Sequence, residues 1–136
     1  MPYRFSNCNA FWYCFSPYVA KGNSLISLDY IKEKKKYLQQ FCDVLIIEGA
    51  GGLMVPLEKN LFIIDLIKEL DSQAILITPS KLGCINDTLL SINALKAKNI
   101  DFEFFINLYQ DIDSFEKVSK PFLLDYFKEL NFLNDL

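Results

Sequence analysis

The chain has 136 residues, of which 51% are hydrophobic, 15% aromatic and 23% charged, with a formal net charge of −3 at pH 7. This composition is typical of one globular domain and excludes a disordered chain. The weak negative charge gives no attraction to nucleic-acid phosphates or to an anionic membrane surface. Because the sequence contains no histidine, Ser-His-Asp catalysis, Cys-His catalysis and histidine-based zinc sites are also excluded.

The first 25 or so residues show neither a helical nor a strand periodicity. We therefore expect a single domain over 1–136 whose N-terminal segment, about 1–25, is irregular. The apolar stretch AFWYCF in this segment is far too short to span a bilayer, and no small-residue cleavage site follows it. The four cysteines lack CxxC spacing, which favours reduced thiols and a cytoplasmic location; they are Cys8, Cys14, Cys42 and Cys84.

The next two segments predict a helix followed by a strand. Residues 27–41 carry apolar residues at helical spacing, and their KEKKK cluster (32–36) is expected to be a solvated outer face. The sequence DVLIIE (43–48) is a short, continuous apolar run before a glycine-rich stretch. That pattern is typical of a strand covered on both faces of a sheet.

The remainder of the chain alternates helical and strand patterns. Strands are predicted at 74–79 (AILITP) and 102–109 (FEFFINLY). Helices are predicted at 61–70, 86–98 and 115–130, with Pro121 either interrupting the last helix or setting its true start. Alternation at βαβ spacing predicts an α/β fold with a parallel sheet flanked by helices.

A carboxylate and a glycine-rich loop follow the first predicted strand. Glu48 ends the apolar run, and Gly49, Gly51 and Gly52 come directly after it. In an open α/β sheet, ligands bind beyond the carboxyl ends of the strands. A carboxylate there can hold Mg²⁺, and glycines let the backbone approach a phosphate closely. The alternative is an ordinary turn that begins with an acid.

Two further strand ends carry polar groups. After the strand 74–79, the sequence SKLGCINDTLL has Gly83 for a tight turn and Asn86 or Asp87 to cap a helix, whose free N–H groups form an anion site. Asn107, at the end of the last strand, presents an amide that suits the edge of a nucleobase such as adenine. Without other signals, an ordinary capped turn and a turn-forming asparagine are the favoured explanations of these residues.

Taken together and in this order, the strings IIEGAGGLMVPL, DLI at 65–67, KLGCINDTLLS and INLY resemble dethiobiotin synthetase. The resemblance covers most of the chain from about Ser16 onward. It implies an incomplete P-loop NTPase-type domain of Rossmann-like, three-layer α/β architecture that works as a homodimer. It also implies an enzyme of biotin synthesis that uses ATP and Mg²⁺ to join CO₂ to 7,8-diaminononanoate and to close the ureido ring.

The resemblance further implies roles for individual residues. Glu48 is expected to bind Mg²⁺, and Gly49, Ala50 and Gly51 to lie against the nucleotide phosphates. Asn107 and Leu108 are expected to face adenine. The turn formed by Leu82, Gly83, Cys84, Ile85 and Asn86 is expected to hold the substrate carboxylate at a helix N-terminus and to reach the active site of the partner subunit.

The chain departs from the family pattern in one respect. It contains no GxxxxGK[ST] string, so the catalytic lysines are expected in a region ahead of residue 1, and the chain is interpreted as a C-terminal portion. A chain without these lysines is expected to be inactive alone. The alternatives are a catalytically dead remnant that still dimerises, another P-loop synthetase such as a cobyric acid synthase relative, and an α/β domain in which EGAGG is only a turn.

Overall fold

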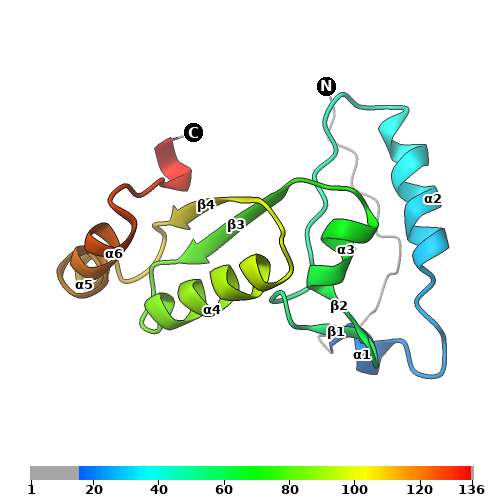
Figure 1. The fold of residues 1–136 in the computed structure, drawn as a ribbon, viewed down its shortest axis with the longest axis horizontal. Coiled ribbons are helices and arrows are strands. Elements are labelled where there is room, and N and C mark those ends of the chain that lie inside the picture. Colours follow the sequence, from blue (N-terminus) through cyan, green and yellow to red (C-terminus); the bar gives the residue numbers. More distant parts are fainter. Residues whose placement is uncertain (1–15, 136) are drawn as a thin grey trace. The chain divides into compact units, whose positions relative to one another are not determined.

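The computed structural model describes residues 16–135, so residues 1–15 of the predicted irregular segment, with Cys8 and Cys14, lie outside the described residues (Figure 1). The chain divides into two compact units, Met1–Ser72 and Gln73–Leu136. Within the described part, no helix has both the length and the apolar character that a membrane crossing requires. Cys42 is a free, exposed thiol and Cys84 a free, buried one.

The first unit begins with the short helix α1 (Pro17–Ala20) and the longer helix α2 (Leu28–Gln39). The prediction of a helix at 27–41 is therefore confirmed. Ser27 precedes the helix, and its hydroxyl accepts a hydrogen bond of 3.2 Å from the N–H of Tyr30. This side chain satisfies one of the N–H groups that every helix leaves free in its first turn.

The lysine cluster of α2 is only partly the solvated face that the sequence predicted. The Lys32 ammonium lies 2.6 Å from the carboxylate of Glu69. The Lys35 ammonium donates to the backbone carbonyl groups of Leu70 and Asp71. Positive charge is favourable at a helix C-terminus, where carbonyl groups lack partners within the helix. No residue of α2 is buried, so these polar contacts connect it to α3.

A short hairpin leads into helix α3. Strands β1 (Pro56–Glu58) and β2 (Leu61–Phe62) pair antiparallel, and α3 (Ile63–Glu69) follows directly. The Asp65 carboxylate accepts a 2.8 Å hydrogen bond from the N–H of Phe62 at the helix start. The sequence predicted one helix over 61–70 and missed the hairpin. Among the described residues of this unit, the buried apolar ones are Leu57, Ile63, Ile64 and Leu70.

The strand predicted at 43–48 is wrong for this structure. These residues run as coil between α2 and β1 (Figure 1). Val44 is 76% exposed and Ile46 is 88% exposed. A strand is stable only when neighbouring strands satisfy its backbone groups, and no described strand pairs with this segment. The local apolar pattern was therefore not sufficient to form a strand.

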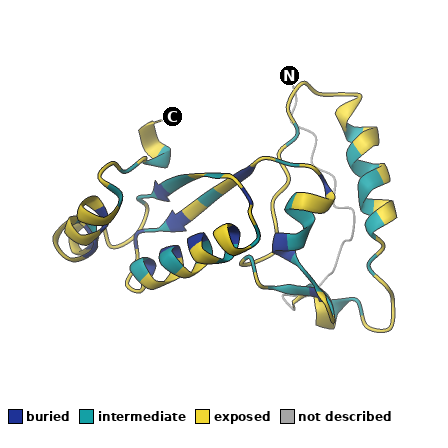
Figure 2. Cartoon of the chain, in the orientation of Figure 1, coloured by how far each residue is buried: buried dark blue, intermediate teal, exposed yellow. Residues whose placement is uncertain are grey.

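The second unit contains the parallel sheet that the sequence predicted. Strands β3 (Ala74–Pro79) and β4 (Phe102–Asn107) pair in parallel, in a register that runs from Ala74 opposite Phe102 to Pro79 opposite Asn107. Helix α4 (Cys84–Ala97) connects them, and Figure 2 shows its buried residues on the side that faces the strands. These residues recur at helical spacing: Cys84, Thr88, Ile92 and Leu95.

The C-terminal segment packs against the same sheet. It contains α5 (Ile112–Ser114), a π-helical turn (Phe115–Ser119), α6 (Lys120–Phe127) and the short 3₁₀-helix Leu133–Asp135. Pro121 is in the first turn of α6, so it starts that helix, as one of the two predicted alternatives required. The core cluster joins one residue each from α4, β4, the π-helical turn and α6: Cys84, Ile106, Phe115 and Leu123.

Candidate functional site

The loop after Glu48 is fixed on helix α3. The N–H groups of Ile63 and Ile64 donate to the carbonyl groups of Val55 and Leu53, at 3.0 and 2.9 Å. These bonds use the first free N–H groups of α3, so the loop itself occupies this helix N-terminus. Glu48 is an exposed residue.

Close packing leaves no room for a Cβ atom at two glycines of this loop, Gly49 and Gly51. A Cβ atom at residue 49 would lie 2.7 Å from Cγ2 of Ile63, and one at residue 51 would lie 2.9 Å from Cγ2 of Val55. Gly51 also has a φ of 77°, in the left-handed region that favours glycine. The glycine-rich pattern at Gly49 and Gly51 therefore follows from close packing and backbone conformation, with or without a bound phosphate.

The turn after β3 leads directly into α4. Gly83 has a φ of 92° and occupies the position before the first helical residue. Leu82 is 87% exposed, whereas Cys84 is buried in the core. The prediction that Asn86 or Asp87 caps the helix is wrong, because both lie inside α4 and no side chain caps its N-terminus. The N-terminus of α4 therefore has no side-chain cap, and the Asp87 carboxylate lies in its first turn.

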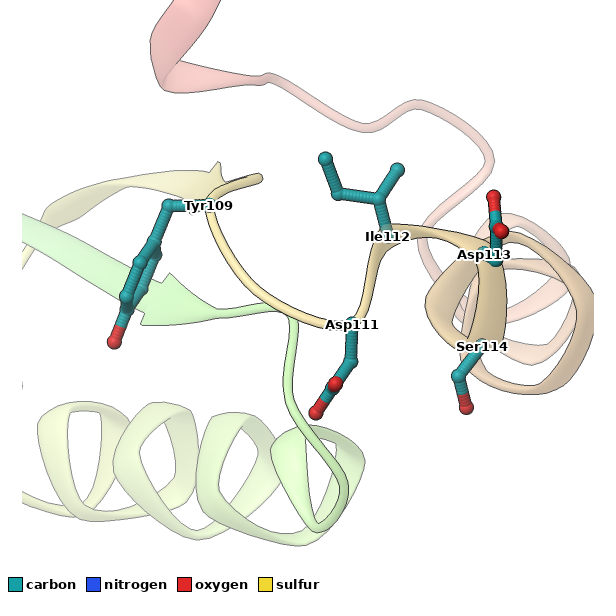
Figure 3. A pocket seen from close by; sticks show the side chains of 5 residues that line it. All are labelled: Tyr109, Asp111, Ile112, Asp113 and Ser114. Atoms are coloured by element: carbon teal, nitrogen blue, oxygen red, sulfur yellow. The ribbon is translucent and has the colours of Figure 1, made fainter.

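The turn after β4 lies at the same edge of the sheet. Asn107 is the last residue of β4, opposite Pro79, and Leu108 packs against the core cluster. An open pocket of about 520 Å³ follows, lined by Tyr109, Asp111, Ile112, Asp113 and Ser114. Figure 3 shows the Tyr109 and Asp111 side chains projecting from the same side of the turn, with Ile112 projecting the opposite way.

Sequence reasoning missed this pocket. The sequence around the pocket, Q-D-I-D-S, is a mostly polar run after a strand end, and it indicates a turn rather than a binding surface. The conformation of this turn is not visible in the sequence, because it depends on Asp111, which has a φ of 50°. A residue other than glycine is uncommon in that left-handed region.

The structure brings together some of the predicted residues. The turn at 82–86 and residues Asn107 and Leu108 belong to the second unit and leave two adjacent parallel strands at the same end. Glu48, Gly49, Ala50 and Gly51 belong to the first unit, so the full set of predicted ligands remains a prediction. Among residues 16–135, no three Cys, Asp or Glu side chains cluster as a metal site.

Glu58, on β1, is a carboxylate with a hydrogen bond and an ion pair. The N–H of Ile26 donates to the Glu58 carboxylate at 2.9 Å, and the Lys21 ammonium lies 3.1 Å from it. The hydrogen bond from Ile26, followed by the one from Lys21, holds the pKa of Glu58 below its usual value. This carboxylate connects residues 21–26 to the hairpin and has a structural role that the sequence did not reveal.

The parallel sheet agrees with the comparison to known families. Residues 5–107 match the family model described as an AAA domain. The match covers most of the chain, and the chain belongs to this family of P-loop NTPase-type domains, with helices and a parallel sheet. The observed sheets are small, with two strands in each.

The relatives define the resemblance more closely. The chain is 55% identical over 107 residues to the ATP-dependent dethiobiotin synthetase BioD of Sulfurovum, an alignment that covers 79% of this chain and 51% of that protein. The protein of the same name from Wolinella succinogenes is 38% identical, with coverage of 79% and 51%. The one from Methanocaldococcus jannaschii is 39% identical, with coverage of 74% and 49%.

These matches confirm the resemblance to dethiobiotin synthetase. The chain spans about half the length of the curated relatives it matches.

Proposed function

We propose that the chain is part of an ATP- and Mg²⁺-dependent dethiobiotin synthetase that joins CO₂ to 7,8-diaminononanoate and closes the ureido ring in biotin synthesis. The observation that carries the proposal is the 55% identity to a protein named ATP-dependent dethiobiotin synthetase. We also propose that residues 1–136 form one incomplete domain of the Rossmann-like, three-layer P-loop type, in a cytoplasmic homodimer.

In this proposal Glu48 is a ligand of Mg²⁺ bound to the ATP phosphates, and Gly49, Ala50 and Gly51 lie against those phosphates. Mg²⁺ commonly keeps several waters and takes only one or two protein carboxylates together with phosphate oxygens. The single exposed carboxylate of Glu48 fits that mode, although no described cluster of acids encloses it. When bound, the metal would neutralise charge that develops on the phosphates.

The two turns of the second unit supply the other contacts. Asn107 and Leu108 would face adenine, with the Asn107 amide offering both a donor and an acceptor. The turn of Leu82, Gly83, Cys84, Ile85 and Asn86 would hold the substrate carboxylate through backbone N–H groups at the start of α4, in the active site of the partner subunit. The uncapped helix start supports this anion site.

Turnover is the first test. Because the chain has no GxxxxGK[ST] string, we expect it to lack the P-loop lysine that stabilises a transferring phosphoryl group. We expect no dethiobiotin above background when the purified chain is given ATP, Mg²⁺, bicarbonate and the diamine. Clear turnover would refute the proposed inactivity and would identify catalytic residues within these 136 positions.

Nucleotide binding is the second test, and it uses a matched pair of variants. Glu48→Ala is expected to abolish the Mg²⁺ dependence of ATP binding measured by calorimetry. Glu33→Ala removes an exposed acid from α2 and is expected to leave that dependence unchanged. Equal behaviour of the two variants would support the alternative in which EGAGG is only a turn.

The remaining alternatives predict different results. A non-catalytic remnant would form a dimer on analytical ultracentrifugation without binding ATP at all. Another P-loop synthetase, such as a cobyric acid synthase relative, would bind ATP but would not bind 7,8-diaminononanoate. The names of the relatives favour dethiobiotin synthetase over this second alternative.

A further inference from the structure

Ser80 is a buried polar residue between the two strand-end turns. It is the first residue after β3 and is 1% exposed. The residue before it, Pro79, lies opposite Asn107 at the end of β4. A buried hydroxyl that lacks a hydrogen-bond partner destabilises the fold, and most buried hydroxyls have one. The position of that partner decides what Ser80 does.

The partner is a single residue of the other turn. The Ser80 hydroxyl donates to the backbone carbonyl of Gln110. The backbone N–H of Gln110 donates in turn to the Ser80 hydroxyl oxygen, with 3.4 Å between N and Oγ. A hydroxyl can donate and accept at once, so one side chain engages both backbone groups of one residue. Thirty residues separate the two positions along the chain.

Each end of this contact lies two residues from a proposed binding element. Ser80 precedes the turn at 82–86, while Gln110 follows Asn107 and Leu108 and lies between the pocket residues Tyr109 and Asp111. Asp111 has the left-handed backbone noted above. The contact with Ser80 fixes the backbone of Gln110, and it therefore also fixes the neighbouring pocket residues Tyr109 and Asp111, which follow Asn107 and Leu108.

We propose that Ser80 is a positioning residue that keeps the turn after β3 and the turn after β4 in one mutual geometry. Its role rests on the proposed function, in which the first turn binds the substrate carboxylate and the second faces adenine. Ligand contact at one turn is then transmitted to the other through the Ser80–Gln110 contact. Ser80 itself touches neither ligand.

Hydrogen exchange of the full chain tests the positioning without any ligand. In Ser80→Ala, the amides of 81–86 and of 107–111 are expected to exchange between about two- and tenfold faster, the effect of losing one neutral hydrogen bond. Amides of the β3–β4 ladder are expected to be unchanged. Ser80→Thr, which keeps the hydroxyl, is expected to restore slow exchange at both turns.

Thr88→Val is the matched control. Thr88 is fully buried in α4 of the same unit, and its hydroxyl oxygen has no hydrogen-bond partner among the described residues. Its replacement removes a buried hydroxyl without breaking a contact, so exchange at the two turns should not rise. If Ser80→Ala does not fold, Ser80→Cys, with a weaker donor, is expected to give the same localised pattern at smaller amplitude.

Three results of the hydrogen-exchange experiment would each overturn the proposal. Faster exchange throughout the unit would show that Ser80 contributes only to stability. Faster exchange at one turn alone would show that the turns are not held together. Failure of Ser80→Thr to restore slow exchange would show that the hydroxyl is not the cause.

A titration with Mg²⁺-ATP, followed by NMR, separates this proposal from the proposed function. In the unmodified chain, amides at 107–108 and at 82–86 are expected to shift together. In Ser80→Ala only the amides at 107–108 should respond, and a persistent response at 82–86 would contradict the coupling. If the unmodified chain shows no shift at all, the proposed nucleotide function fails, while the exchange results still decide the role of Ser80.

Discussion

Replacing Gly49 by alanine tests whether packing on α3 requires a glycine at this position. The new Cβ atom would lie 2.7 Å from Cγ2 of Ile63, whereas carbon atoms in favourable contact are about 3.5–4.0 Å apart. Ile63 cannot easily move away, because it is buried in the first turn of α3 and a β-branched side chain in a helix has nearly one χ1 rotamer. One of the two backbones must therefore shift.

Overpacking of this kind costs about 1–3 kcal/mol, and we expect Gly49→Ala to lower the free energy of unfolding by that amount. Gly52→Ala is the matched control, because a Cβ atom there meets nothing within 4 Å. We expect it to change stability by less than about 0.5 kcal/mol. Urea unfolding followed by far-ultraviolet circular dichroism measures both variants.

The double variant Gly49→Ala with Ile63→Leu identifies the contact itself. Leucine lacks the γ-methyl branch at Cβ, so most of the lost stability should return, with an interaction energy of about 1 kcal/mol or more. Equal urea midpoints for Gly49→Ala and Gly52→Ala would refute the reasoning. The glycine pattern at residue 49 would then need another explanation, and close approach of a phosphate would be the leading one.

Three further predictions concern single polar groups. The Ile26 N–H and then the Lys21 ammonium hold the folded-state pKa of Glu58 below its unfolded value. Its stabilising contribution is therefore complete above the unfolded pKa and is lost as pH falls through the lower folded pKa. Glu58→Gln should weaken this loss of stability at acid pH, measured as urea midpoints in a pH series. Lys35→Met should cost about 1 kcal/mol in urea unfolding, because carbonyl groups at the end of α3 lose their donor; an unchanged midpoint would show that the contact is not maintained in solution. Thr88→Val should raise the free energy of unfolding by about 1 kcal/mol, because it removes a buried hydroxyl without a described partner; a lower melting temperature would mean that the hydroxyl has a partner after all.

Local signals predicted most of the elements correctly. The helix at 27–41 has a serine cap before a periodic apolar pattern, and it forms as α2. The strand at 74–79 is a short apolar run between polar residues, and β3 has the same bounds. The hairpin was missed because β1 is three residues long, with one buried side chain, Leu57, between a proline and a glutamate. Such a segment has too few residues to show a period of two.

Non-local pairing explains the main error in the fold. Residues 43–48 and 74–79 are similarly apolar, and the sequence alone does not distinguish them. β3 forms a strand because β4 satisfies its backbone in a six-residue parallel register. No described strand does so for 43–48. Strand formation depends on a partner distant in sequence, which no local pattern specifies.

The same distinction applies to the candidate site. Asn107 and the turn at 82–86 were predicted from their positions after strands, and the parallel register places both turns at one end of the sheet. The Ser80–Gln110 contact was not predictable, because a serine after a strand indicates only a turn in the sequence. Its importance comes from burial and from a partner thirty residues away, which only the tertiary structure provides.

The exposure of 43–48 bears directly on how Glu48 could act as the proposed Mg²⁺ ligand. Gly49 is held against Ile63, whereas the residues that lead to Glu48 on the other side have no backbone pairing among the described residues. A metal ligand binds tightly when its position is fixed before binding, because ordering it afterwards costs conformational entropy. Glu48 is fixed from one side only, so we expect Mg²⁺-ATP to bind the isolated chain weakly. Pairing of 43–48 with another strand would bury Val44 and Ile46 and fix the carboxylate from both sides, so that strand pairing and metal affinity would rise together.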